Sequence, residues 1–115
     1  MITLQAPASK SVSHRMLIAA SLAEGESLVH HALASADLER TRELLVTAGA
    51  AMDDLGGGSW RVSGMPHGPK GGSADVPADC FVSESGTTCR LLTAVLAAGR
   101  GHFRIHGVPR MHERP

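Results

Sequence analysis

The chain has 115 residues, of which 43% are hydrophobic, a size and composition typical of one small domain or of part of a larger one. Eleven basic side chains balance eleven acidic ones, so bulk charge predicts neither a nucleic-acid partner nor a membrane surface. The sequence shows two cysteines, no secretory leader and no stretch long enough to span a membrane. We therefore expect a reduced, soluble, cytoplasmic protein without a disulfide framework.

In its first half the chain alternates between strand-like and helical patterns. A strand at residues 2–5 precedes a helix that begins near Ser11 and is closed by Gly25. The apolar stripe expected on that helix consists of Val12, Met16, Ala19, Ala20 and Ala23. A strand at residues 28–30 follows, and then a second helix that Ser35 or Asp37 opens and Gly49 ends, with Leu38, Leu45 and Ala48 facing inward.

The second half predicts a hairpin and then a further helix between two strands. Glycines 56–58 separate the hairpin arms, with Trp60 and Val62 on the second arm. A loop at 64–79 leads to a strand at 80–82, a helix at 85–98 and a strand at 103–105. The order β-α-β-α-β-β followed by β-α-β indicates an α/β fold with helices packed on sheets. RMLIAASLAEG and RLLTAVLAAG also form a weak internal repeat, although any two Ala/Leu amphipathic helices could give one.

The stretch PASKSVSHR ends a strand and opens the first helix. Lys10 and Ser11 stand where unpaired amides and the helix dipole favour an anion, and Arg15 lies one turn along on the same face. Together these side chains suit a phosphate or carboxylate. The alternative is that Ser11 only caps the helix while Lys10 and Arg15 are solvated.

Two later motifs repeat this arrangement of a strand, a tight turn and a cation. In ESGTTCR, Gly86 permits close approach of a ligand to the backbone, Thr87 offers a hydroxyl and Arg90 follows in the second turn. In GVPRMHERP, Arg110 follows a strand and a Gly-x-Pro turn. Each motif is weak when taken alone, because arginines in turns are often surface charge. Three in succession predict a shared anion site.

PASKSVSHRMLIAASLAEGES, ESGTTCRLLTAVLAAG and GVPRMHERP, in that order, resemble the N-terminal quarter of the 5-enolpyruvylshikimate-3-phosphate (EPSP) synthases, the 3-phosphoshikimate 1-carboxyvinyltransferases. The resemblance implies two domains, each of three β-α-β-α-β-β units, with helix N-termini directed at the cleft between them. Residues 1–10 would be the opening strand and crossover, 11–83 the first unit and 84–115 the start of the next.

The same resemblance implies an activity and its partners. Members of the family transfer the enolpyruvyl group of phosphoenolpyruvate to the 5-hydroxyl of shikimate 3-phosphate and release phosphate, in the pathway to aromatic amino acids. We therefore expect these two small-molecule substrates, a monomeric parent enzyme, and neither a metal nor an organic cofactor. The family's acid/base carboxylates would lie beyond Pro115, so the chain alone is expected to be inactive.

Roles for individual residues also follow from the resemblance. Lys10 would be catalytic and contact both substrates, while Ser11 and Arg15 would hold the shikimate phosphate ester. The Gly86 backbone and Arg110 would hold phosphoenolpyruvate. Supporting roles would fall to Glu84, Thr87 and Arg90.

The chain departs from the familiar family pattern at two positions. Ala8 stands where glycine is usual, a mild change if that turn needs no positive φ. Glu84 stands where many members have asparagine, and a carboxylate should repel an anionic substrate. Our hypothesis is that Glu84 pairs with Arg90 or Lys10, which leaves the Gly86 amide to meet the substrate.

The sequence leaves two alternative functions open. The sister transferase that acts on a UDP-linked amino sugar, UDP-N-acetylglucosamine, favours Lys-Asn where Lys10 and Ser11 stand, and usually carries a reactive loop cysteine with no counterpart here. A non-catalytic anion-binding domain of the same fold is the second alternative. His102 and His106 lack a carboxylate or thiol at ligand spacing, so no metal site is expected. Cys89 is predicted to be a small core side chain, and His14 an exposed one.

Overall fold

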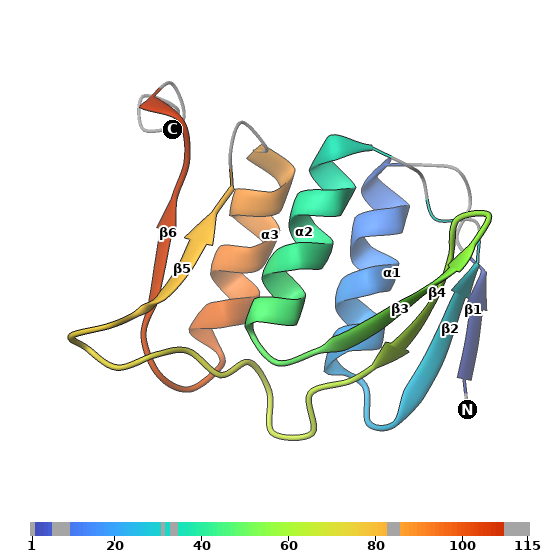
Figure 1. The fold of residues 1–115 in the computed structure, drawn as a ribbon, viewed down its shortest axis with the longest axis horizontal. Coiled ribbons are helices and arrows are strands. Elements are labelled where there is room, and N and C mark those ends of the chain that lie inside the picture. Colours follow the sequence, from blue (N-terminus) through green and yellow to red (C-terminus); the bar gives the residue numbers. More distant parts are fainter. Residues whose placement is uncertain (1, 6–9, 31, 33–34, 83–85, 110–115) are drawn as a thin grey trace.

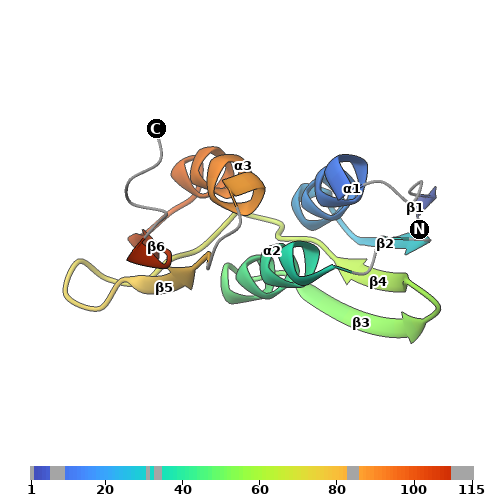
Figure 2. The same ribbon diagram turned by 90° about the horizontal axis from the view of Figure 1, so that it is seen from above.

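The computed structural model describes residues 2–5, 10–30, 32, 35–82 and 86–109. In Figure 1 the described helices stand side by side, with one sheet on either side, and Figure 2 shows that the two outer helices lie over strands while the middle helix lies between the sheets. Helix α2 (Ala36–Thr47) packs against both α1 (Lys10–Leu22) and α3 (Gly86–Ala97), and lies between them in Figure 1. The described elements follow the predicted order, β-α-β-α-β-β and then β-α-β, so the expected α/β architecture is confirmed.

The larger sheet has four strands in the order β1-β2-β4-β3. Strand β1 (Ile2–Gln5) is parallel to β2 (Glu26–His30), whereas β4 (Ser59–Ser63) is antiparallel to both β2 and β3 (Ala51–Gly56). The predicted hairpin is confirmed. Its three glycines have φ values of 85°, 61° and 80°, a conformation that residues with a Cβ adopt only at a cost.

The smaller sheet consists of β5 (Ala78–Phe81) and β6 (Phe103–His106), which are parallel. Helix α3 (Gly86–Ala97) connects them, just as α1 (Lys10–Leu22) connects the parallel pair β1 and β2. The internal repeat noticed in the sequence therefore corresponds to two β-α-β units. Strand β5 begins two residues earlier than predicted, because Ala78 and Asp79 already pair with β6.

Helix α2 (Ala36–Thr47) begins and ends where the sequence predicted. Ser35 is its N-cap, and the Ser35 hydroxyl accepts a hydrogen bond of 3.1 Å from the Leu38 amide. The chain leaves the helix at Gly49, whose φ of 125° suits glycine. Leu38, Leu45 and Ala48 are buried, as expected.

The predicted inner face of α1 is partly wrong. Ala19 is exposed, whereas Leu17, Ile18 and Ala20 are buried together with the polar residues Ser13, His14 and Ser21. His14 was expected to be exposed, but it has no accessible surface. Hydrogen bonding is the physical reason: polar side chains can occupy a helix's buried face when their donors and acceptors have partners inside the protein. The Ser21 hydroxyl, for example, donates to the Leu17 carbonyl at 2.8 Å.

All three helices begin at the same end of the molecule (Figure 1). Strands β1, β2, β5 and β6 also end there, because each strand runs toward that end and each helix runs back. The positive ends of three helix dipoles consequently lie along one edge. This edge carries the first two sequence motifs.

Candidate functional site

The first motif lies at the start of α1. Lys10 is the first residue of the helix and Ser11 the second; for both, the structure describes the backbone alone. Arg15 lies on the second turn with an exposed side chain. The backbone position of Lys10 at the helix start is the one that the sequence predicted, and the role of Arg15 stays a prediction.

The second motif lies at the start of α3. Gly86 is the first residue of that helix and is half-buried, and Arg90 is exposed one turn later. Of Thr87 the structure describes the backbone. Glu84 and Arg110 lie outside the described residues, so their predicted roles and the proposed pairing of Glu84 stay predictions.

A chain of buried hydrogen bonds joins the two helix starts through α2. Thr41 Oγ1 lies 2.8 Å from His14 Nδ1 on α1 and 2.7 Å from Thr88 Oγ1 on α3. Thr88 in turn donates to the Asp37 carbonyl of α2 at 3.2 Å. His14, Thr41 and Thr88 have no accessible surface. Because the bonds of His14 and Thr88 both end on the Thr41 oxygen, the start of α1 and the start of α3 are tied to each other through α2.

The charges near the helix starts differ between α2 and its two neighbours. The first turn of α2 carries Asp37 and Glu39, which offset the positive end of its dipole. The described first turns of α1 and α3 contain no acidic residue. Each is instead followed by an exposed arginine, Arg15 or Arg90. A helix N-terminus that is followed by a cation favours a bound anion, whereas Glu84, which precedes α3 in the sequence and lies outside the described residues, would oppose one.

A cluster of aromatic and charged side chains lies where β5 and β6 end. Phe81 and His106 are the last residues of these strands, with ring centroids 5.1 Å apart. His106 Nε2 lies 2.8 Å from Asp79 Oδ1, and the Arg40 guanidinium lies 5.5 Å from the centre of the Phe81 ring. The cluster fixes the end of β6, the strand that precedes the third motif.

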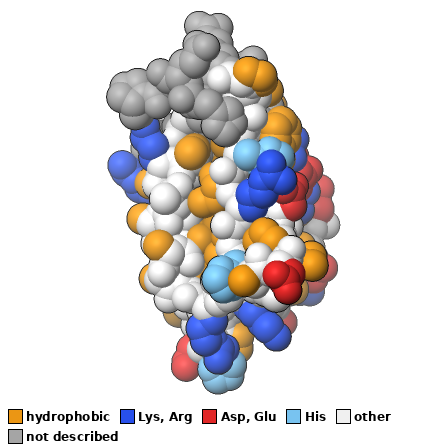
Figure 3. Space-filling view, turned by 90° about the vertical axis from the view of Figure 1, so that its left-hand side faces the viewer, with side chains coloured by type: hydrophobic (Ala, Val, Ile, Leu, Met, Phe, Trp, Pro, Cys, Tyr) orange, Lys and Arg blue, Asp and Glu red, His pale blue; other side chains and the backbone are white. Residues whose placement is uncertain are grey.

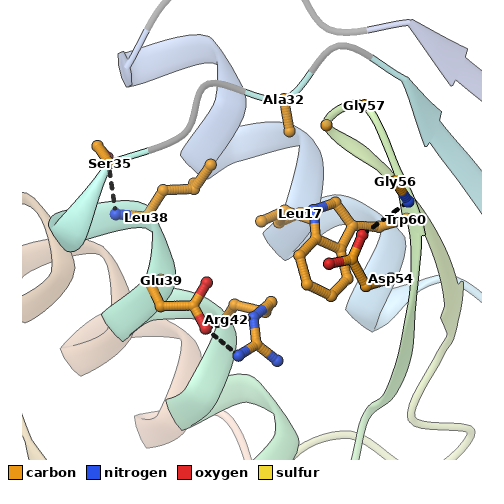
Figure 4. A pocket seen from close by; sticks show the side chains of 11 residues that line it. Leu17, Ala32, Ser35, Leu38, Glu39, Arg42, Asp54, Gly56, Gly57 and Trp60 are labelled. Carbon is orange, nitrogen blue, oxygen red and sulfur yellow. Dashed lines mark hydrogen bonds and ion pairs between the residues drawn. The ribbon is translucent and has the colours of Figure 1, made fainter.

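A cavity of about 280 Å³ lies between the start of α2 and the hairpin turn (Figure 4). Arg42 lies over the Trp60 ring at 4.8 Å from its centre and is paired with Glu39. The hydrogen bond from Arg42 lowers the pKa of the Glu39 carboxyl, and the same bond raises the pKa of Arg42. Glu39 holds Arg42 by an ion pair within α2, and the contact of Arg42 with the Trp60 ring joins α2 to the hairpin.

The side of the molecule away from the hairpin is formed by β5, β6 and α3, and Figure 3 shows this side. A shallow groove between α3 and β6 is lined mainly by small and apolar residues, namely Thr93, Leu96, Ala97, Gly99, Gly101, His102, Phe103 and Ile105. Figure 3 shows hydrophobic side chains between basic and histidine side chains on this face.

The described ranges lack a metal-binding cluster and a membrane-spanning helix. They contain no group of three His, Cys, Asp or Glu side chains placed to share a metal ion. None of their helices combines the length and apolar character needed to cross a bilayer.

The sequence model of EPSP synthase (3-phosphoshikimate 1-carboxyvinyltransferase) matches residues 2–115, nearly the whole chain. The chain belongs to the EPSP synthase family. This finding confirms the resemblance on which the motif assignments rest. The EPSP synthase match and the relatives named below carry the shikimate enzyme's name, and none of them carries that of the UDP-amino-sugar transferase.

Curated relatives in the EPSP synthase family align with almost all of the chain. The 3-phosphoshikimate 1-carboxyvinyltransferase of Nitrosomonas europaea is 44% identical over 109 residues, which are 95% of this chain and 24% of the relative. That of Ralstonia pickettii is 41% identical over 113 residues, or 98% of this chain and 25% of the relative. The chain thus spans about a quarter of the length of the curated relatives it matches.

A solved EPSP synthase structure gives the same result for the fold. The enzyme from Acinetobacter baumannii superposes with a TM-score of 0.81 at 29% sequence identity, over 98% of this chain and 25% of that chain. The fold described above is therefore the one found in part of an EPSP synthase.

Sequence reasoning missed the residues that connect the motifs. Neither Thr41 nor Thr88 was predicted to have a role, and His14 was predicted to be exposed, although all three are buried. The available signal was the position of a histidine and two threonines on helix faces that also carry buried apolar residues. That signal does not reveal which side chains meet, since Thr41 lies far from both motifs in the sequence.

Proposed function

We propose that this chain forms the N-terminal quarter of an enzyme that transfers the enolpyruvyl group of phosphoenolpyruvate to the 5-hydroxyl of shikimate 3-phosphate, with release of phosphate. One observation carries the proposal. The two helix starts that bear family motifs are bonded together through Thr41, and neither described first turn contains an acidic residue. Two anionic substrates need such a pair of neighbouring positive sites.

The chemistry of the reaction fits this arrangement. Both substrates carry phosphate and carboxylate groups, so bringing them together concentrates negative charge. Positive groups that are fixed before binding offset the repulsion and align the hydroxyl with the enol carbon. In the proposed enzyme Lys10 contacts both substrates, Ser11 and Arg15 hold shikimate 3-phosphate, and the Gly86 amide and Arg110 hold phosphoenolpyruvate. Thr87 and Arg90 support the second group.

Other parts of the proposal rest on family membership. The catalytic carboxylates lie in the remainder of the enzyme, so the 115-residue chain alone should show no turnover. Residues 1–10 form the opening strand and crossover, 11–83 the first unit and 84–115 the start of the next. A monomeric, cytoplasmic parent enzyme without metal or cofactor is part of the same prediction.

Phosphate release by the complete protein tests the proposed function. Release should require both phosphoenolpyruvate and shikimate 3-phosphate, and replacement of shikimate 3-phosphate by UDP-N-acetylglucosamine should abolish it. The 115-residue chain serves as the matched inactive sample. A complete protein that binds both anions without turnover would favour the non-catalytic alternative, and turnover with the amino-sugar nucleotide would contradict the proposal.

A further inference from the structure

The buried series of hydrogen bonds that links His14, Thr41, Thr88 and the Asp37 carbonyl has a definite donor-to-acceptor direction. A carbonyl oxygen accepts hydrogen bonds but cannot donate them, so Thr88 gives its hydroxyl proton to the Asp37 carbonyl. Thr88 Oγ1 then accepts the proton of Thr41, and Thr41 Oγ1 accepts from His14 Nδ1. In these three bonds each hydroxyl donates once and accepts once, so His14 carries its proton on Nδ1.

This series of hydrogen bonds lies close to the starts of α1 and α3. His14 lies one turn after Lys10 and immediately before Arg15. Thr88 lies two residues after Gly86 and two before Arg90. The Thr41 hydroxyl is therefore the connection between the segment proposed to hold shikimate 3-phosphate and the segment proposed to hold phosphoenolpyruvate.

We propose that Thr41 is a positioning residue, whose hydroxyl fixes the first turns of α1 and α3 relative to each other and so sets the spacing of the two substrate anions. The inference rests on the proposed function. Apolar packing alone would leave the helices free to slide by fractions of an ångström. Directional bonds of 2.7 and 2.8 Å from one oxygen restrict that freedom.

Variants of the complete enzyme separate positioning from general stability. Thr41→Val keeps the shape but removes the hydroxyl, and Thr41→Ser keeps the hydroxyl. Ser21→Ala is the matched control, because Ser21 is equally buried on α1 but donates to Leu17, outside the chain of bonds that joins the helices. Misplaced substrate groups are costly, so Thr41→Val should lower kcat/KM at least about tenfold and raise KM for both substrates.

Thr41→Ser should restore kcat/KM to within about threefold of wild type, and Ser21→Ala should leave both KM values unchanged. A purely structural role would lower the active fraction, and hence apparent kcat, without moving KM. Unchanged KM values in folded Thr41→Val, or equal losses in Ser21→Ala, would overturn the proposal. Should Thr41→Val fail to fold, Thr88→Val removes the next link and is judged by the same criteria.

Hydrogen exchange gives a second readout that does not depend on turnover. Thr41→Val should speed exchange of the amides at residues 14–17 and 90–93 at least about tenfold relative to Ser21→Ala. If wild-type enzyme shows no turnover, the proposed function fails, and exchange alone decides the inference. Faster exchange at both helix starts then supports the positioning role, and equal exchange in the two variants refutes it.

Discussion

At the scale of single residues, the two thiols of the chain differ in their surroundings. Cys80 on β5 is fully buried, whereas Cys89 on α3 is half-buried. Burial raises the pKa of the Cys80 thiol, and the neighbouring Asp79 carboxylate raises it further. A raised pKa means that the folded state disfavours the thiolate, which is the reactive form.

We predict that Cys80 is alkylated by iodoacetamide at least about tenfold more slowly than Cys89 at pH 8, since the raised pKa of the Cys80 thiol and its burial both oppose reaction. The sign of the pKa shift also predicts that the rate at Cys80 keeps rising well above pH 8.5. Digestion with trypsin and with a protease that cuts after Glu84 separates the two cysteines. Mass spectrometry of the resulting peptides measures both rates, and denatured protein provides the control. Faster labelling of Cys80 than of Cys89 would show that β5 opens readily.

Single residues also show which features could be predicted from the sequence and which could not. Ser35, Gly49 and the glycines at 56–58 were assigned correctly, because caps and turns depend on local backbone conformation. His14 was placed wrongly, because its burial depends on Thr41, a partner that only the tertiary structure supplies. The position of Lys10 at the start of a helix was predicted correctly, whereas the substrate contacts of Lys10, Arg15 and Arg90 stay predictions.

At the scale of elements, the helices differ in how their starts are stabilised. Helix α2 has the Ser35 cap and two acidic residues in its first turn. The described first turns of α1 and α3 have no acidic residue and depend instead on their bonds to α2. A bound anion would add stability to α1 and α3 but not to α2.

Replacing the N-cap by Ser35→Ala should therefore weaken the start of α2. The lost hydrogen bond to the Leu38 amide is worth about 1 kcal/mol, which corresponds to roughly fivefold faster exchange in the first turns of α2. Hydrogen exchange of the complete protein measures this, and the amides late in α3 serve as an internal control. No change at α2, or an equal change in late α3, would show that the cap does not stabilise this helix locally.

At the scale of the whole molecule, the shared orientation of the helices creates the candidate site. The repeated β-α-β connection places every described helix start at one end, although the motifs are separated by most of the chain's length. Element order and fold class were predictable from local patterns. The joining of α1 to α3 through α2 was not, because it depends on Thr41, which lies in neither motif.

In the proposed enzyme Lys10, the cation at the start of α1, holds shikimate 3-phosphate. Calorimetric titration of shikimate 3-phosphate into the complete protein tests it, with wild type, Lys10→Met and Lys70→Met compared. Lys70 is the matched control: it is the other lysine of the chain, and its amide bonds to Ala48 at the far end of α2. Loss of a charged hydrogen bond should weaken binding at least about tenfold in Lys10→Met and not in Lys70→Met. Equal affinity in all three proteins would contradict the account.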